Sequence, residues 1–365
     1  MKKYEKIIAP LLAILLGILV GTILLVLSGR SPIYMFSTLI KSMIGYDILK
    51  PGPINLRYFG EFLVFSMPII LTGLSVGFAY RTGLFNIGGE GQVLVGSAAA
   101  TAAALCLPMS GLPHLIVCLL AGALAGAFWA FIPGILQVKK NINVVVTAIM
   151  LNYVGLHFSN WVVQQMPTFA KAKTDYFPVS LKSEFLAELT NKSRLHWGII
   201  VVILALVIYH IIIEKTSFGY SLRATGFNRE GARYAGMKVE RNVVYAMMIS
   251  GAMAGLAGAI ITLGTFGYGR QLGASEGYGF DGIAVALVGG CNSIGIFLAG
   301  LLFGALKVAQ PAMQALQIPK DIATIISACI ILFVSMQYGI MDVVYKIVGK
   351  FKKKDEVAPQ DGGEA

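Results

Sequence analysis

The sequence predicts an all-α protein that crosses a membrane many times, with about ten membrane-embedded helices, some of them broken or re-entrant. The chain of 365 residues is 56% hydrophobic and 13% charged, whereas about a quarter of the residues in soluble domains are charged. Bilayer-length apolar runs recur along it, and Lys and Arg lie mostly in the segments between them. A net charge of +11 distributed in this way indicates membrane topology rather than a nucleic-acid-binding surface.

The first predicted helix covers residues 7–27. Lys2, Lys3 and Lys6 precede it, as in a signal peptide, but the run is too long for a signal-peptide core and no small-residue cleavage site follows. We therefore expect a transmembrane helix with its N-terminus in the cytoplasm. The connection that follows, 28–60, is then expected outside the cell, and Pro51-Gly52-Pro53 breaks any helix within it. The predicted division is a first helix and external loop (1–58), a membrane core (59–348) and a charged tail (349–365).

Eight further apolar runs predict the remaining spans, at 59–80, 84–107, 114–136, 142–163, 197–213, 243–263, 280–309 and 322–338. The run 280–309 is too long for one span and is interrupted at 289–293, so we expect two short helices there, as a hairpin or a re-entrant pair. With the N-terminus inside, the predicted inner segments hold more than half of the 29 basic residues, and the C-terminus is also inside. Small residues spaced by four predict close helix packing at Gly122/Gly126, Gly251/Gly255 and Gly300/Gly304.

The segment 81–96, RTGLFNIGGEGQVLVG, interrupts this apolar pattern. It places Asn86, Glu90 and Gln92 among glycines at membrane depth, where polar groups are costly unless they line a cavity or pack against protein. We favour a functional face over simple packing. A second Gly-rich segment, 277–282, contains Asp281 and predicts an internal repeat of the broken element.

The segment 214–242 is the longest predicted inner connection. Residues 217–225 form a polar entry, and Asn228 is placed to cap a short helix over 229–235 that ends at Gly236. Such a helix, held between two spans, suits docking into a partner. The alternative is a solvated basic loop that only obeys the topology rule.

Four stretches of the sequence resemble one family, and they occur along the chain in the order found in that family. The pattern of Gly226, Asn228, Gly231, Ala232, Tyr234, Ala235 and Gly236 resembles the coupling loop of ABC importer permeases, in the group that contains ribose, simple-sugar and nucleoside permeases. Residues 83–92 resemble the nucleoside branch and lack the Ile-Asp-Leu-Ser-Val-Gly pattern of ribose-type relatives. Residues 143–154 and 279–290 match the same branch. The resemblance covers roughly residues 60–345.

This resemblance, to the branched-chain amino acid/ribose permease superfamily, implies a permease subunit of a bacterial nucleoside ABC importer in the cytoplasmic membrane. The implied partners are a second permease subunit, a cytoplasmic ABC ATPase and an extracytoplasmic substrate-binding lipoprotein. The chain lacks a Gly-x-x-x-x-Gly-Lys-Ser/Thr phosphate loop, so ATP would be hydrolysed on the partner, and no cofactor is expected on this chain. The alternatives are a simple-sugar, ribose-type permease and an ATP-independent secondary transporter.

The predicted substrate path comprises Asn86, Glu90, Gln92, Asn143, Thr147, Phe266, Tyr268 and Asp281. Asn143 and Thr147 share a helix face with Met150, Val154, His157 and Trp161, whereas Asn152 lies opposite and is expected to bond a neighbouring helix. Hydrogen bonding between helices is the alternative role for Asn143 and Thr147. Phe266 and Tyr268, with Tyr278 and Phe280, are stacking or gating candidates, or aromatic-belt residues. Asp281 is placed to cap the broken helix. The predicted ATPase-coupling residues are Gly226, Asn228, Ala232, Tyr234, Ala235 and Gly236.

An enzyme is the remaining class to consider. Residues 273–277, GASEG, match the G-x-S-x-G pattern of serine hydrolases, but no strand precedes Ser275 and the four histidines are scattered. That reading requires a contact between Ser275 and a histidine. The four cysteines all lie in apolar runs without metal-ligand spacing, so we expect no metal site.

Overall fold

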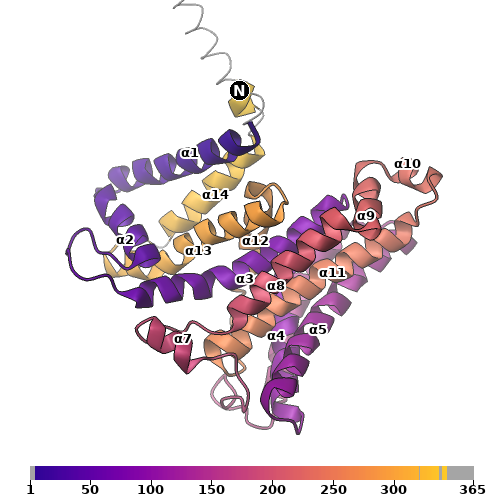
Figure 1. Cartoon of the computed structure of the whole chain (residues 1–365), viewed down its shortest axis with the longest axis horizontal. Helices are drawn as coiled ribbons and strands as arrows, with labels where there is room; N and C mark the ends of the chain where they lie inside the picture. Colours follow the sequence, from indigo (N-terminus) through magenta and orange to yellow (C-terminus); the bar gives the residue numbers. More distant parts are fainter. Residues whose placement is uncertain (1–4, 320, 337–338, 343–365) are drawn as a thin grey trace, which may run out of the picture.

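The computed structural model describes residues 5–319, 321–336 and 339–342, which fold into helices and connecting loops (Figure 1). Within these ranges three isolated bridges are present and no sheet. The predicted charged tail, 349–365, lies outside the described residues. The helical elements are α1 (Glu5–Leu27), α2 (Pro32–Ile44), α3 (Leu56–Arg81), α4 (Gly89–Cys106), α5 (Gly111–Lys140), α6 (Val144–Gln164), α7 (Glu184–Leu189), α8 (Gly198–His210), η2 (Ile211–Lys215), α9 (Ser217–Phe227), α10 (Arg229–Tyr234), α11 (Val239–Ile260), η3 (Ile261–Phe266), α12 (Tyr278–Val288), α13 (Ser293–Ala315) and α14 (Asp321–Ser335).

Six helices in the described ranges are long and apolar enough to cross a membrane. They are α1, α3, α5, α8 with the π-helical turn η2, α11 with the π-helical turn η3, and α13. Helices α4 and α6, of 18 and 21 residues, also have span length but are not among these six. Helices α12 and α14 are apolar but shorter. The all-α, polytopic fold class predicted from the sequence is confirmed.

Helices α3, α4, α5, α8 and α11 lie side by side in a tilted bundle, and α1, α2, α12, α13 and α14 form a group beside it (Figure 1). Helix α7 lies at one end of α3, α8 and α11, and helices α9 and α10 lie at the other (Figure 1). We call these the α7 end and the α10 end. Helices α1 and α14 pack antiparallel, because Gly17 faces Ile330 and Gly21 faces Ile326. The beginning of α1 and the end of α14 therefore lie at the same end of this pair.

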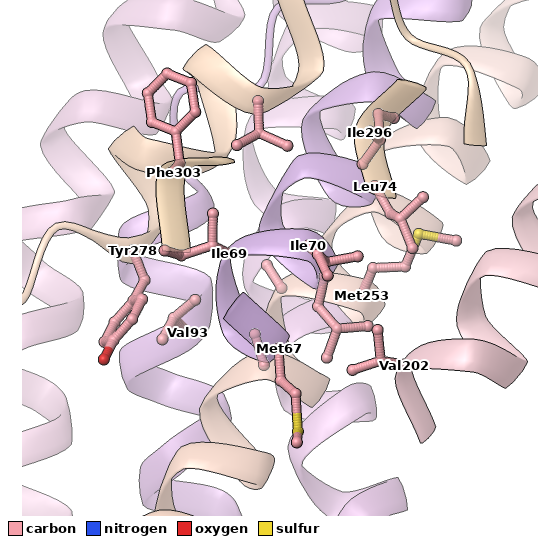
Figure 2. Close-up of a cluster of buried hydrophobic side chains, with 14 of the residues drawn as sticks. Met67, Ile69, Ile70, Leu74, Val93, Val202, Met253, Tyr278, Ile296 and Phe303 are labelled. Carbon is pink, nitrogen blue, oxygen red and sulfur yellow. The ribbon is translucent and has the colours of Figure 1, made fainter. Parts of the chain in front are cut away.

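Helix α3 forms the centre of the core, and almost all of its span is buried. Figure 2 shows its side chains surrounded by residues from five other helices. The labelled α3 residues are Met67, Ile69, Ile70 and Leu74, and the neighbours are Val93, Val202, Met253, Tyr278, Ile296 and Phe303. In a bilayer such tight packing, rather than exclusion of water, holds helices together.

Helices α4, α5 and α11 approach one another through glycines, without side chains between them. A Cβ on Gly126 would lie 2.3 Å from the carbonyl oxygen of Gly251, and one on Gly96 would lie 2.4 Å from that of Gly255. Side chains at these positions would force the backbones apart. The close packing predicted from small-residue spacing is confirmed here.

Three elements differ from the prediction. Helix α2 lies inside the connection predicted to be non-helical, because Pro32 begins it and Gly45 ends it in a left-handed conformation before the Pro-rich stretch is reached. Helix α13 is not short: it continues for 23 residues through Pro311. The predicted polar entry at 217–225 is helical, since Thr216 caps α9 by accepting a hydrogen bond from the Gly219 N–H.

Candidate functional site

The glycine-rich break between α3 and α4 lies against the last turn of α9. Helix α3 ends at Arg81, and Gly83 turns the chain with a φ of 72°. A Cβ on Gly83 would lie 3.0 Å from the Cα of Gly226, and one on Gly226 would lie 2.6 Å from the carbonyl oxygen of Arg81. Only glycines allow this contact, which joins the break directly to the predicted coupling loop.

Inside the break, Asn86 and Gln92 are buried and pair through their amides. Asn86 donates to Gln92 at 3.0 Å and accepts from it at 3.1 Å. Asn86 also donates to the Ser250 hydroxyl at 2.7 Å, and Ser250 donates to the carbonyl of Ser75 at 2.7 Å. The polar groups that are costly at membrane depth therefore satisfy one another within the subunit.

Asn152 of α6 closes the other side of the break. Its amide oxygen accepts from the Gly91 N–H at 2.8 Å, and its amide nitrogen donates to the carbonyl of Ile87 at 3.0 Å. Both are main-chain groups that the interrupted helix leaves without helical partners. The prediction that Asn152 bonds a neighbouring helix is confirmed.

Glu90 connects the two broken segments. Its carboxylate, which is 1% exposed, accepts hydrogen bonds from the N–H groups of Gly277 (2.8 Å) and Gly279 (2.6 Å) at the start of α12. Glu90 also lies in the first turn of α4. One carboxylate thus faces the N-terminal ends of two helices, both of which favour an anion.

Asp281 does not cap α12 as predicted, because Glu90 occupies that position. Its carboxylate instead accepts from the Lys307 ammonium at 2.7 Å. Lys307 of α13 also donates to the carbonyl of Glu276 at 2.9 Å. The start of α12 is therefore held by a carboxylate on one side and an ammonium on the other.

Asn143 and Thr147 lie apart from this buried group, on the exposed face of α6. Asn143 caps the helix by accepting from the Val145 N–H at 2.8 Å, and the Thr147 hydroxyl donates to the Asn143 carbonyl at 3.1 Å. They bond their own helix, not a neighbouring one. At the foot of this face, Asn143 lines a pocket of about 360 Å³ with Gly83, Leu84, Phe85, Gln137, Asn141, Ile142, Val144 and Val145.

Phe266 and Tyr268 form part of an aromatic cluster at the α7 end. Their rings meet edge to face with centroids 6.0 Å apart, and Tyr176 meets Tyr268 at 5.4 Å. The guanidinium of Arg270 lies 3.5 Å from the centroid of the Phe266 ring. Tyr278, by contrast, is buried and Phe280 is exposed.

The predicted coupling loop has the local geometry expected of it. The Asn228 side chain accepts from the Gly231 N–H at 2.9 Å and caps α10, and Gly236 follows the helix with a φ of 80°. Ala232 is buried and Ala235 is the C-terminal cap. Phe227 and Tyr234 are 92% and 98% exposed. Among the described residues these two aromatics have no covering partner, so they are exposed apolar surface on one short segment.

Two observations, both limited to the residues that the structure describes, concern a metal site and a serine hydrolase site. No group of three or more His, Cys, Asp or Glu residues could hold a metal ion. Ser275 is exposed, and none of the hydrogen bonds made by the histidines reaches it. The contact required of a serine hydrolase is therefore missing from this part of the chain.

Three residues that hold the site together were not singled out from the sequence. Lys307 is the one charged residue in α13 and could have been found as an isolated charge in an apolar run. Ser250 gave no signal, because serine is common in tightly packed membrane helices. Arg270, which pairs with Glu276 at 3.0 and 2.8 Å, was hidden in a polar loop.

Comparison with known proteins identifies one family and several permeases to which the chain is similar. Residues 58–335 match the family described as "Branched-chain amino acid transport system / permease component". The chain is 43% identical to the guanosine ABC transporter permease protein NupP of Bacillus subtilis, over 97% of this chain and 99% of the relative. It is 35% identical to the nucleoside ABC transporter permease protein NupB of Lactococcus lactis, over 100% of this chain and 99% of the relative.

A relative with a different printed substrate is also similar over most of its length. The glucose ABC transporter permease protein TsgB13 of Haloferax volcanii is 31% identical, over 98% of this chain and 94% of the relative. The two bacteria above each contain a second, more distant relative. These are NupQ, 26% identical over 72% of this chain and 84% of the relative, and NupC, 26% identical over 66% and 78%.

Proposed function

Because the chain belongs to the family of branched-chain amino acid transport system permease components, we propose that it is the membrane subunit of an ABC importer for nucleosides. The observation that carries the choice of substrate is the similarity, over nearly the whole chain, to permeases named for guanosine and nucleosides. A simple sugar is the second candidate, favoured by the 31% identity to a glucose permease.

The partner ATPase would dock on α9 and α10. The exposed side chains of Phe227 and Tyr234 supply aromatic anchors of the kind that dominate protein interfaces. Gly226 touches the backbone of Arg81 and Gly83, so a force on this loop would act directly on α3 and on the break before α4. ATP would be hydrolysed on the partner, since this chain lacks a phosphate-binding loop.

A second permease subunit would face the exposed side of α6. Helices α5 and α8 expose aliphatic side chains such as Leu120, Leu124, Ile203 and Val207, as lipid requires. Helix α6 exposes His157 and Trp161 among apolar side chains such as Met150 and Val154, and its N-cap Asn143 is exposed as well. The occurrence of NupP with NupQ and of NupB with NupC supports a paralogue as the second subunit.

The substrate path would follow this face of α6 between the two subunits. Asn86, Glu90 and Gln92 have their hydrogen bonds satisfied inside this chain, so in this arrangement they support the path rather than bind substrate. Asn143 and Thr147 line it from α6. At its foot, Gln137 lines the pocket, and its buried side-chain oxygen has no hydrogen-bond partner among the described residues.

The remaining parts of the proposal concern orientation. The α10 end would be cytoplasmic and the α7 end extracytoplasmic, as the distribution of Lys and Arg predicts, with both termini inside the cell. An extracytoplasmic receptor would then deliver substrate at the α7 end, near Phe266 and Tyr268. We propose no cofactor on this chain.

Uptake measurements test the proposal. Labelled guanosine, ribose and glucose are supplied to cells with and without this chain. Guanosine uptake that is lost with the chain and depends on ATP supports it. Loss of sugar uptake alone would move the protein to the sugar branch. Uptake that survives ATP depletion but collapses with the ion gradient would indicate a secondary transporter and contradict the ABC mechanism.

A further inference from the structure

We propose that Glu214 is the link through which α9 pulls on α3, so that α3 follows the movement of α9 in both directions of the transport cycle. The proposal deepens the proposed function and rests on it, because it takes α9 and α10 as the elements that the ATPase moves. Glu214 is not among the predicted coupling residues, which lie between 226 and 236.

The π-helical turn η2 and helix α9 meet in a tight corner at the α10 end. A Cβ on Gly219 would lie 2.0 Å from the carbonyl oxygen of Ile212, and the Thr216 hydroxyl donates to the same carbonyl at 2.6 Å. Thr216 also caps α9 by accepting from the Gly219 N–H. Because backbone lies against backbone and a cap crosses the bend, we expect η2 and α9 to move as one piece.

This corner meets the end of α3 through two contacts of different kinds. The first is the approach of Gly226 to the backbone of Arg81 and Gly83, where no hydrogen bond joins the two backbones in the part of the chain that the structure describes. The edge-to-face contact of Phe78 with Tyr209 of α8, one turn earlier along α3, is likewise uncharged. Atoms in such contacts repel steeply when they are pushed together but attract only weakly when they are drawn apart. These contacts therefore transmit a push better than a pull.

The second contact is the ion pair between Arg81 and Glu214. Arg81 is the last residue of α3, and its guanidinium donates to Oε1 of Glu214 at 2.5 Å. The other carboxylate oxygen, Oε2, accepts from Arg223 of α9 at 2.9 Å. The three side chains are 25% to 33% exposed, so water screens their charges only in part. Opposite charges oppose separation, so this bridge can transmit a pull from α9 to α3.

Each member of the bridge has its own role. Glu214 lies in the π-helical turn η2, and such turns are frequent at functional sites. Arg223 holds one oxygen of the carboxylate and leaves the other directed at Arg81. Arg81 uses one nitrogen in this pair, so the contact depends on its positive charge rather than on the fork of the guanidinium. Glu214 is thus a positioning residue that acts through Arg81 on α3.

The two contacts serve opposite halves of the transport cycle. When the ATPase moves α9 toward α3, the Gly226 contact pushes α3 away. When α9 returns, the Glu214 bridge draws α3 back with it. Without the bridge α9 would still push α3 but would not draw it back, so ATP would be hydrolysed with fewer nucleosides moved for each ATP.

The number of nucleosides taken up per ATP hydrolysed measures this link, because a merely structural role would lower both rates together. The full transporter is reconstituted in liposomes, and uptake of labelled guanosine and hydrolysis of ATP are measured in the same preparation. We expect Arg81→Gln and Glu214→Gln each to lower the ratio roughly fivefold, as loss of a partly shielded ion pair predicts, with ATP hydrolysis retained. Arg81→Lys keeps the charge, so its ratio should stay near that of the parent.

Two further variants decide whether the pair acts as a unit. The double variant R81Q with E214Q should show the same loss as each single variant, whereas two independent defects would multiply to roughly twenty-five-fold. Arg194→Gln is the matched control: it removes an ion pair with Glu61, at 2.6 Å, near the other end of α3, and its ratio should equal that of the parent.

The outcomes separate this proposal from the proposed function. ATP-dependent uptake with a parent-like ratio in Arg81→Gln and Glu214→Gln would overturn the link alone, as would an equal loss in Arg194→Gln. Failure of the proposed function appears in the unmodified transporter, which would then take up guanosine without ATP or not at all, and the link to an ATPase would fall with it.

Discussion

The carboxylate of Glu90 accepts a hydrogen bond from the backbone N–H of Gly279 at 2.6 Å, across 189 positions of the sequence. This contact brings together the first turns of α4 and α12, the two helices that begin after glycine-rich breaks. The helix ends would repel each other without an anion between them. The isolated acidic residue of the first break is thus explained by the geometry of the second.

The approach of these two helices depends on the absence of a side chain at Gly279. A Cβ there would lie 2.2 Å from the Glu90 backbone nitrogen and 2.6 Å from the Gly89 carbonyl carbon, and neither backbone can yield. We expect Gly279→Ala to lower the free energy of unfolding by about 3 kcal/mol, the upper end for overpacking. Thermal unfolding in detergent measures this. Gly273→Ala, which meets open space, should stay within about 0.5 kcal/mol of the parent, and equal effects of the two would contradict this packing of α4 against α12.

The exposed face of α6 predicts a difference between two tryptophan substitutions. Val154 of α6 and Val207 of α8 are 51% and 48% exposed, so neither substitution should disturb the fold. We expect Val154→Trp to reduce uptake more than tenfold, because it would fill the path, and Val207→Trp to leave uptake unchanged, because it would face lipid. The unfolding temperature of each variant provides the folding control. Normal uptake in Val154→Trp would place the path elsewhere.

Tyr234 predicts a loss of assembly without a loss of stability. Its side chain is 98% exposed, so its removal costs the isolated chain nothing. At an interface, an aromatic anchor of this kind contributes about 2 kcal/mol, which corresponds to roughly thirtyfold weaker binding. Co-purification of the ATPase with Tyr234→Ala is the measurement. Phe185→Ala, 66% exposed at the opposite end, is the control, and equal retention of the ATPase by both would argue against docking at α10.

His196 predicts that the protein loses stability in mild acid. It is fully buried beside Gly264, and its Nδ1 accepts from the Gly198 N–H at 3.1 Å. Burial, and then the nearby Arg194 cation, lower the pKa of His196 from 6.5 to about 4. The unfolded chain therefore binds a proton between these pH values that the folded chain excludes, and stability falls as the pH decreases through this window.

The expected loss is about 3 kcal/mol between pH 7 and pH 4. Unfolding temperatures recorded across this range measure it. His196→Gln keeps an acceptor for Gly198 but does not titrate, so its profile should be flatter by that amount. An unchanged slope in this variant would exclude His196 as the origin of the acid sensitivity.

Local chemistry made part of the site predictable. Asn228 and Gly236 mark the start and the stop of α10 because capping depends on residues only a few positions apart. The outward orientation of Asn143 and the inward orientation of Asn152 follow from helical periodicity. The apolar runs and the close glycine contacts were likewise predictable, because each depends on spacing along one helix.

The remaining parts depend on contacts that no local rule specifies. The sequence indicates that burying the Glu90 carboxylate is costly. Its partners lie in another segment, so the sequence alone is equally consistent with a substrate as the partner. Helix α2 was not predicted, because the helix-breaking Pro51-Gly52-Pro53 was taken to apply to the whole connection. Asp281 sits where a cap is expected, yet Lys307 draws its carboxylate away. Whether the assigned residues line the substrate path stays a prediction.

The glycine contacts among α4, α5 and α11 have a mechanical consequence. Where backbone meets backbone at these glycines, little side-chain rearrangement is available, so we expect the three helices to tilt together. The span Val239–Phe266 has 28 residues and is about 42 Å long. A rotation of about 5° at its α10 end would displace the opposite end by roughly 4 Å, more than the length of a hydrogen bond. A small movement at the α10 end is thus large enough to break hydrogen bonds at the α7 end.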